Sequence, residues 1–149
     1  MPLLLRLLHG LVPCLVLMAC SEVSNGTGSI SQRLGERLRT PGTQEVDLGQ
    51  LTSFGWDRFY VFRPGSTRTE VCRFIAAPRT ACGRIIRVEQ APEGHVFMIF
   101  GLGPQLTHVE MHALANGRFD LDFPEAGLPR QRAVFRVRRS GEAWRLEPR

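Results

Sequence analysis

Short segments that are typical of β-strands dominate the chain from Thr43 onward, and they restrict its fold more than any other feature. Each is rich in β-branched and aromatic residues or alternates apolar with polar residues, and turn-forming residues separate neighbouring segments. Strands joined by such short connections pair in antiparallel fashion. The expected strands cover residues 46–48, 57–63, 84–90, 95–100, 106–114, 118–123, 132–139 and 142–146.

One helix is expected among these strands, at residues 67–76. Thr67 and Glu70 form a T-x-x-E capping box at its start. Apolar residues then recur at helical spacing, and the helix ends before Pro78. The sequence therefore predicts an α+β fold, an antiparallel meander of about six to eight strands with one helix packed on it.

The first 20 residues have the organisation of an export signal. Arg6 and the amino terminus supply positive charge, and an apolar stretch runs from about Leu7 to Met18. A bilayer-spanning helix needs about 20 apolar residues, so this stretch is too short to span and fits a signal peptide. The stretch ends in the sequence Leu17-Met18-Ala19-Cys20.

That four-residue sequence resembles the lipobox of bacterial lipoproteins. The resemblance implies that the Cys20 thiol receives a diacylglycerol thioether and that residues 1–19 are then removed. In this family an Asp after the lipidated Cys retains the protein at the inner membrane, so Ser21 favours the periplasmic face of the outer membrane. The alternatives are a plain secreted protein in which Cys20 has no special role, or a buried helix.

Removal of residues 1–19 from the 149-residue chain would leave 130 residues, enough for one domain. We expect residues 20–42 to be a lipidated tether and linker, and residues 43–149 to form a small α+β domain. Within the linker, apolar residues recur every four positions at Ile30, Leu34 and Leu38. This pattern predicts either a short amphipathic helix on the membrane surface or a frayed linker helix weakened by Gly35.

Cys72 and Cys82 are expected to form a disulfide. Export places them in an oxidising compartment, where paired thiols usually become bonded. Their Cα atoms should then lie within about 4.4–6.8 Å of each other. The alternative is two buried free thiols.

The charge balance argues against a nucleic-acid partner. The chain has 19 basic residues, all of them arginine, and 14 acidic residues, which gives a net charge of +5. These arginines are spread along the sequence, whereas a nucleic-acid interface needs a clustered basic patch. Membrane contact is expected through the lipid anchor, with an envelope protein or anionic lipid as a further partner.

Two alternating segments near the end of the chain predict a hairpin with its turn at Ser140-Gly141. In the predicted register Val137 lies opposite Trp144, and the large apolar side chains share one face. The opposite face carries three arginines, Arg136, Arg138 and Arg145. This face is either an anion-binding site for lipid phosphate or a solvated surface that acids from neighbouring strands neutralise.

A second hairpin is predicted for residues 106–123, with its tip at residues 115–117. Its polar face would place His112 beside Asp120 and Glu110 beside Asp122. The residues of this face are His108, Glu110, His112, Asp120 and Asp122. The face is either an ordinary solvated sheet surface or a divalent-metal site built from imidazole and carboxylate groups.

No motif in the sequence indicates catalysis. A nucleophile elbow, a phosphate-binding Walker loop and a cysteine with a convincing histidine partner are absent from it. We therefore expect a protein without enzymatic activity and without a cofactor. An aromatic block between Trp56 and Phe62 is interpreted as core packing, with a ligand pocket as the alternative.

Two stretches of the expected domain resemble known exported proteins. The segment LTSFGWDRFYVFRP at residues 51–64 resembles a block found in small uncharacterised exported proteins of proteobacteria. The segment GSTRTEVCRFIAAP at residues 65–78 is similar, at Gly65, Thr67, Val71 and Pro78, to the turn and helix of SmpA/OmlA-type lipoproteins. Those lipoproteins belong to the outer-membrane barrel-assembly machine. Taken as a whole, the sequence leads us to expect a lipid-anchored envelope protein that acts as a non-enzymatic interaction or structural module. A small-ligand-binding or metal-binding lipoprotein is the alternative.

Overall fold

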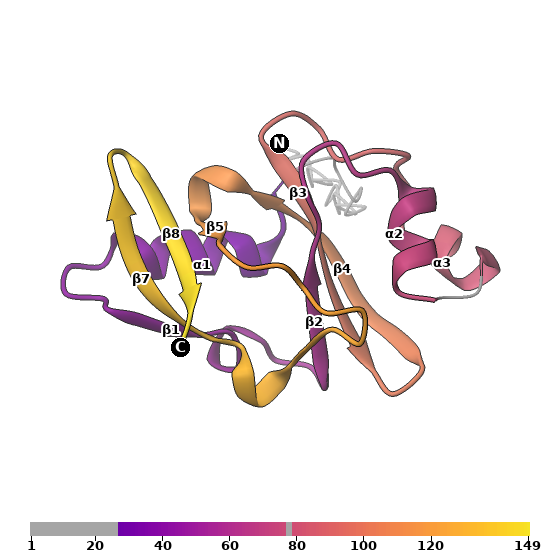
Figure 1. The fold of residues 1–149 in the computed structure, drawn as a ribbon, viewed down its shortest axis with the longest axis horizontal. Coiled ribbons are helices and arrows are strands. Elements are labelled where there is room, and N and C mark those ends of the chain that lie inside the picture. The colour runs from indigo at the N-terminus through magenta and orange to yellow at the C-terminus, as the bar shows by residue number, and fades with distance from the viewer. Residues whose placement is uncertain (1–26, 77–78) are drawn as a thin grey trace, which may run out of the picture.

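The computed structural model describes residues 27–76 and 79–149 (Figure 1). The lipobox at Leu17–Cys20 and residues 1–26 as a whole lie outside the described residues. The helices of the described part are α1 (Ser29–Arg39), α2 (Arg68–Phe74) and α3 (Arg79–Ile85). Its strands are β1 (Glu45–Asp47), β2 (Arg58–Val61), β3 (His95–Leu102), β4 (Gln105–Ala113), β5 (Arg118–Phe119), β6 (Leu128–Pro129), β7 (Val134–Ser140) and β8 (Ala143–Pro148). Short 3-10 turns are η1 (Leu48–Leu51), η2 (Leu114–Asn116) and η3 (Arg130–Arg132).

The strands form two four-stranded sheets. Sheet A has the order β4-β3-β2-β6, and sheet B has the order β1-β7-β8-β5. All neighbours are antiparallel except β5 and β8, which are parallel. Figure 1 shows sheet B at one end of the molecule, sheet A in the middle, and α2 with α3 at the other end. The predicted α+β class is confirmed. The structure adds a second sheet and helix α3, and it places in the domain helix α1, which the sequence predicted only as part of the linker.

Sheet A separates two hydrophobic cores, because its central strands are buried on both faces. Along β3, Phe97 and Ile99 point to one core, and Met98 and Phe100 point to the other. The run HVFMIFGL is almost continuously apolar for this reason, since a strand covered on both faces has no polar side.

Core 1 lies between sheet A, sheet B and α1. Its buried residues come from both ends of the described chain and include Phe59 and Phe135, which are fully buried. The remaining members are Ile30, Leu34, Leu38, Val46, Leu48, Trp56, Met98, Phe100, Leu128, Ala133 and Leu146. Because α1 supplies three of these side chains, it is an integral part of the domain.

This placement of α1 corrects the prediction of a membrane-surface or frayed linker helix, and with it the expected start of the domain near Thr43. Ile30 and Leu34 are fully buried in core 1. Gly35 lets the helix approach η2 closely, since a Cβ at this position would collide with the side chain of Asn116. The four-residue period marked the apolar face correctly, but a period alone does not say whether that face meets lipid or protein.

Core 2 lies on the other face of sheet A, under α2 and α3. A disulfide joins Cys72 of α2 to Cys82 of α3, with 5.9 Å between the Cα atoms, as predicted. The predicted capping box is confirmed as well: the Thr67 hydroxyl accepts from the Glu70 N–H, and the Glu70 carboxylate accepts from the Thr67 N–H. The hydrogen bonds from the Thr67 backbone and hydroxyl lower the pKa of Glu70.

The expected strand at residues 84–90 is wrong, because this stretch begins inside α3. The disulfide requires Cys82 to face core 2, and a helix also turns Ile86, four positions later, towards that core. Both side chains are buried, and the Ile86 N–H donates to the Cys82 carbonyl. Tertiary packing therefore overrides the β propensity of the isoleucines.

The hairpin of β7 and β8 forms as expected but in a different register. Val137 lies opposite Leu146, and Arg139 lies opposite Trp144, so the pairing is displaced by two residues from the prediction. A displacement of two residues keeps every side chain on its predicted face. The turn accordingly moves to Gly141 and Glu142, with Gly141 at a positive φ of 62°.

Candidate functional site

The predicted hairpin of residues 106–123 does not form. β4 pairs with β3, and β5 pairs with β8 of the other sheet. Asp120 consequently contacts Arg145, and Asp122 contacts Arg63. The five residues of the predicted metal face are thus divided between two places. Among residues 27–76 and 79–149, no group of three or more His, Cys, Asp or Glu side chains could hold a metal ion.

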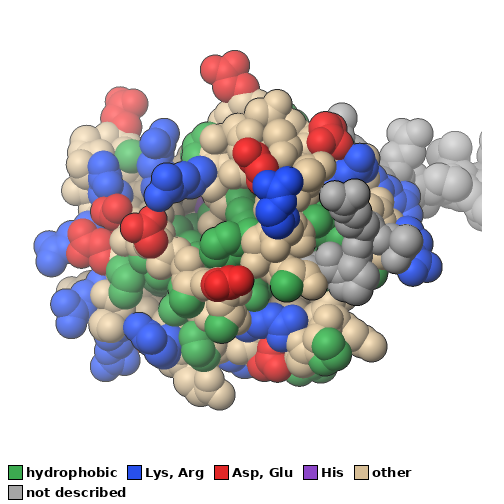
Figure 2. All heavy atoms as spheres, turned by 45° about the vertical axis from the view of Figure 1, so that its right-hand side comes forward, with side chains coloured by type: hydrophobic (Ala, Val, Ile, Leu, Met, Phe, Trp, Pro, Cys, Tyr) green, Lys and Arg blue, Asp and Glu red, His purple; other side chains and the backbone are tan. Residues whose placement is uncertain are grey.

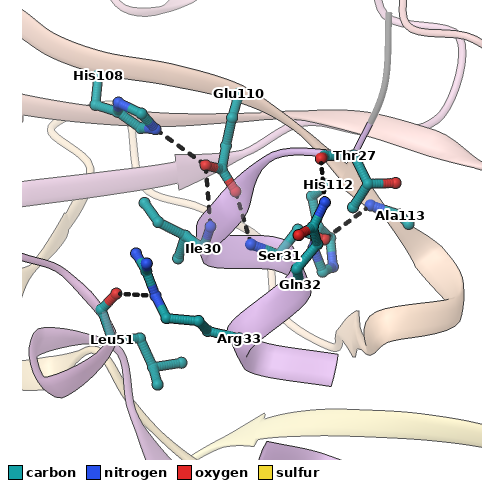
Figure 3. Close-up of polar contacts among 10 residues, drawn as sticks. All are labelled: Thr27, Ile30, Ser31, Gln32, Arg33, Leu51, His108, Glu110, His112 and Ala113. Atoms are coloured by element: carbon teal, nitrogen blue, oxygen red, sulfur yellow. Dashed lines mark hydrogen bonds and ion pairs between the residues drawn. The ribbon is translucent and has the colours of Figure 1, made fainter. Parts of the chain in front are cut away.

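The polar face of β4 is instead covered by the first turn of α1 (Figure 3). The Glu110 carboxylate accepts hydrogen bonds from the N–H groups of Ile30 (3.2 Å) and Ser31 (2.7 Å). It also accepts one from Nε2 of His108, at 3.0 Å. The first N–H groups of a helix have no partner within the helix and carry partial positive charge. Glu110 therefore caps α1 from a strand that lies about 80 positions further along the chain.

His112 joins the same helix to the strand through Ser31. Its Nε2 lies 2.7 Å from the Gly117 carbonyl, which can only accept, so Nε2 carries the proton. Nδ1 therefore accepts from the Ser31 hydroxyl at 2.8 Å. That hydroxyl oxygen accepts in turn from the Ala113 N–H, at 3.1 Å. Burial lowers the pKa of His112 to about 4, which keeps the ring neutral in this arrangement.

Ser31, His108, Glu110 and His112 form what we call the α1–β4 network. Ser31 and His112 are fully buried, and their polar atoms are already hydrogen-bonded to each other and to the backbone. A serine nucleophile has to reach its substrate, and this one is enclosed. The network's chemistry is structural: it fixes the start of α1 to sheet A.

Side chains fill the space between the start of α1 and β4. A Cβ on Gly28, the residue before α1, would collide with the Glu110 side chain. The Gly28 N–H donates to the Met111 carbonyl at 2.9 Å, and Thr27 forms a bridge with Met111. The chain is therefore held against β4 from Thr27 onward.

The predicted arginine face lies on the outside of sheet B. Arg138 and Arg145 are opposite each other in β7 and β8, and Arg136 is on the same face. Acids reach these arginines as in the solvated alternative: Glu147 lies 2.8 Å from Arg138, and Asp120 lies 3.0 Å from Arg145.

Sequence reasoning missed a further member of this face, Arg118. It lies opposite Arg145 in the parallel pair of β5 and β8, so Arg118, Arg145 and Arg138 form a row across three strands. Arg118 has no ion-pair partner among the residues that the structure describes. A parallel pairing between distant segments leaves no local signal in the sequence, which is why this neighbour was not found.

A surface groove begins beside this arginine row. It consists of two adjoining cavities of about 360 and 250 Å³ that share Val61, Phe62, Arg63, Leu121 and Phe123. Figure 2 shows hydrophobic side chains gathered in the middle of one face, among charged ones. Three members of the predicted aromatic block, Trp56, Phe59 and Tyr60, are buried as core packing. The fourth, Phe62, lines the groove.

The chain matches no protein-family model, no curated protein and no solved structure. The resemblances described for residues 17–20, 51–64 and 65–78 therefore stay predictions. Within the described part of the chain, no helix has both the length and the apolar character needed to cross a membrane.

Proposed function

We propose that this protein is a lipid-anchored cell-envelope protein whose domain acts as a non-enzymatic interaction module at the periplasmic face of the outer membrane. The observation that carries the proposal is the sequence Leu17-Met18-Ala19-Cys20 at the end of a short apolar stretch. Each methylene buried in the bilayer contributes roughly 0.8 kcal/mol to the free energy of membrane binding, so two or three acyl chains on one cysteine would anchor the protein stably. Ser21 favours the outer membrane.

The attachment of α1 supports a role close to the membrane surface. Because the chain is fixed to β4 from Thr27 onward, residues 21–26 are the connection between the proposed anchor and the domain. Fully extended, the steps from Cys20 to Thr27 span at most about 25 Å, at 3.6 Å per residue. A tether of residues 20–42, as the sequence predicted, would reach much further. A partner of the domain would thus lie on or near the membrane.

Cys20→Ser tests this proposal. We expect the variant to accumulate as an unprocessed precursor and to incorporate no labelled fatty acid, because the thioether cannot form. Cys14→Ser is the matched control, since it removes a thiol from the same apolar stretch and leaves the lipobox intact. If Cys20→Ser matures and fractionates with membranes as the wild type does, the anchor proposal is wrong.

A small-ligand function is the second candidate, and one observation favours it, the groove described above. The metal-binding alternative has no such support, because its three β4 side chains already have hydrogen-bond partners. His108 bonds to Glu110, and both Glu110 and His112 bond to Ser31 of α1. Metal analysis of the purified protein tests that alternative directly. Co-purification from membranes tests for a protein partner.

A further inference from the structure

The groove is a site where both cores reach the surface. Val61, Leu121 and Phe123 pack against core 1, whereas Phe62 packs against core 2. Its larger cavity, about 360 Å³, lies at the lower end of the sizes found for small-molecule sites. A cavity of this size suits one alkyl chain better than two.

The stretch that the two cavities share is lined mainly by apolar side chains, and an aromatic side chain is exposed at one end of the groove. Phe74 of α2 stands edge-on to Phe62, with 5.6 Å between the ring centroids. It is 37% exposed, one of three large hydrophobic side chains that are exposed among the residues that the structure describes. Exposed apolar surface in a concave place is typical of a ligand site.

The two ends of the groove differ in charge. Arg118 and Arg145 line one end, where Asp120 is the acid that accompanies them. Glu70 and Asp122 line the other end. Like charges directly opposite each other in a sheet are unfavourable, and Arg118 and Arg145 are such a pair. A bound anion at this end would relieve the repulsion, whereas the acids would disfavour an anion at the far end.

One ion pair connects the two walls of the groove. Arg63, just after β2, lies 3.1 Å from Asp122 of the opposite wall. The two side chains are 86% and 92% exposed, so solvent screens the pair and it contributes little stability. A ligand can therefore separate these side chains and enter between the walls.

We propose that the groove binds a single-chain anionic amphiphile. Its phosphate or carboxylate head would contact Arg118 and Arg145, and its alkyl chain would lie between Phe62 and Phe123. The arginine fork suits such an oxyanion head, and the apolar walls suit the chain. This site does not depend on lipidation of Cys20, although a membrane-held domain would be close to a source of such molecules.

A photoreactive dodecyl phosphate, with a diazirine in its alkyl chain, tests the proposal on the full-length protein in phosphatidylcholine vesicles. We expect the label on the peptides that contain Phe62 and Phe123. Arg118→Gln combined with Arg145→Gln should reduce this labelling about fivefold or more, because charge-assisted hydrogen bonds to the head are lost. Arg87→Gln, an exposed arginine away from the groove, is the matched control and should label as the wild type does.

Further measurements distinguish the contribution of the anionic head from that of the alkyl chain. A dodecanol with the same diazirine should label the groove weakly, and excess inorganic phosphate should compete poorly with dodecyl phosphate. Leu121→Glu should abolish groove labelling while circular dichroism remains that of the wild type. Equal labelling by dodecanol, unchanged labelling of the double arginine variant, or full competition by inorganic phosphate would overturn the proposal. The labelled peptides lie in the groove, so failure here is distinct from failure of the lipid anchor at Cys20.

Discussion

The N-termini of α1 and α2 are capped by the same kind of group in two different ways. At α2, Glu70 and Thr67 cap each other across three positions of the chain. At α1, Glu110 reaches the first N–H groups from a strand about 80 positions away. Both use a carboxylate that accepts from backbone N–H groups, which also suits the positive end of a helix.

The two caps differ most in their surroundings. Glu70 is exposed, so water competes for its hydrogen bonds and screens its charge. Glu110 is 8% exposed and stands between α1 and sheet A. If the buried carboxylate is removed, two buried N–H groups lose their partner and water cannot replace it. A local cap thus stabilises one helix end, whereas the distant cap joins two layers of the domain.

Glu110→Ala should have the largest effect. We expect the free energy of unfolding to fall by about 3–5 kcal/mol, because the N–H groups of Ile30 and Ser31 remain buried without an acceptor. Urea unfolding followed by tryptophan fluorescence measures the loss. Glu36→Ala, on the exposed side of α1, is the matched control and should change stability little. A loss below about 1 kcal/mol for Glu110→Ala would contradict the importance of the distant cap.

Acid should weaken the α1–β4 network through His112. Its pKa is about 4 in the folded protein, below the ordinary value of 6.5, so the unfolded chain takes up a proton first as pH falls. The stability that depends on neutral His112 is therefore complete above pH 6.5 and is lost as pH falls towards 4. We expect a loss of about 2–3 kcal/mol between pH 7.5 and 4.5, from 1.36 kcal/mol per pKa unit.

The difference in the free energy of unfolding between wild type and His112→Gln isolates the contribution of His112, because all other groups titrate in both proteins. Urea unfolding at several pH values should show a steeper fall for the wild type between pH 6.5 and 4.5. Parallel curves for the two proteins would mean that His112 does not titrate as its burial indicates.

Thr67→Ala should have the smallest effect of the three. The hydroxyl that accepts from the Glu70 N–H is lost, but water can reach the exposed helix end. We expect a loss of about 1 kcal/mol in the free energy of unfolding, and Thr67→Ser should retain most of the stability. A loss as large as that of Glu110→Ala would remove the distinction between the local and the distant cap.

The same distinction explains what the sequence could predict. The capping box of Thr67 and Glu70 and the Cys72–Cys82 disulfide depend on residues close in the chain, and both were predicted correctly. The positions of Glu110 and His112 under α1 depend on residues about 80 positions apart. The alternation along β4 showed that these side chains share a face, but it carried no information on what covers that face.

Pairing between distant strands limited the prediction in sheet B as well. The faces of the β7–β8 hairpin were correct because the alternation fixes them, and the register was off by two because the turn was placed one residue early. The position of Arg118 on the arginine face was not predicted, because its neighbour Arg145 comes from a parallel strand 27 positions later. Patterns within a segment thus gave the class and most strands, while contacts between segments determined the site.

The composition of core 1 has a consequence for when the domain can fold. Its first member, Ile30, and its last, Leu146, lie 116 positions apart, and β1 pairs with β7 near the other end of the described chain. A chain that emerges amino terminus first cannot complete core 1 until the residues near Leu146 have also emerged. The entropy cost of closing the intervening loop comes before the stabilisation from these distant contacts. If the protein is exported, as we propose, this delay keeps the chain unfolded, and therefore able to cross the membrane, until its export is nearly complete.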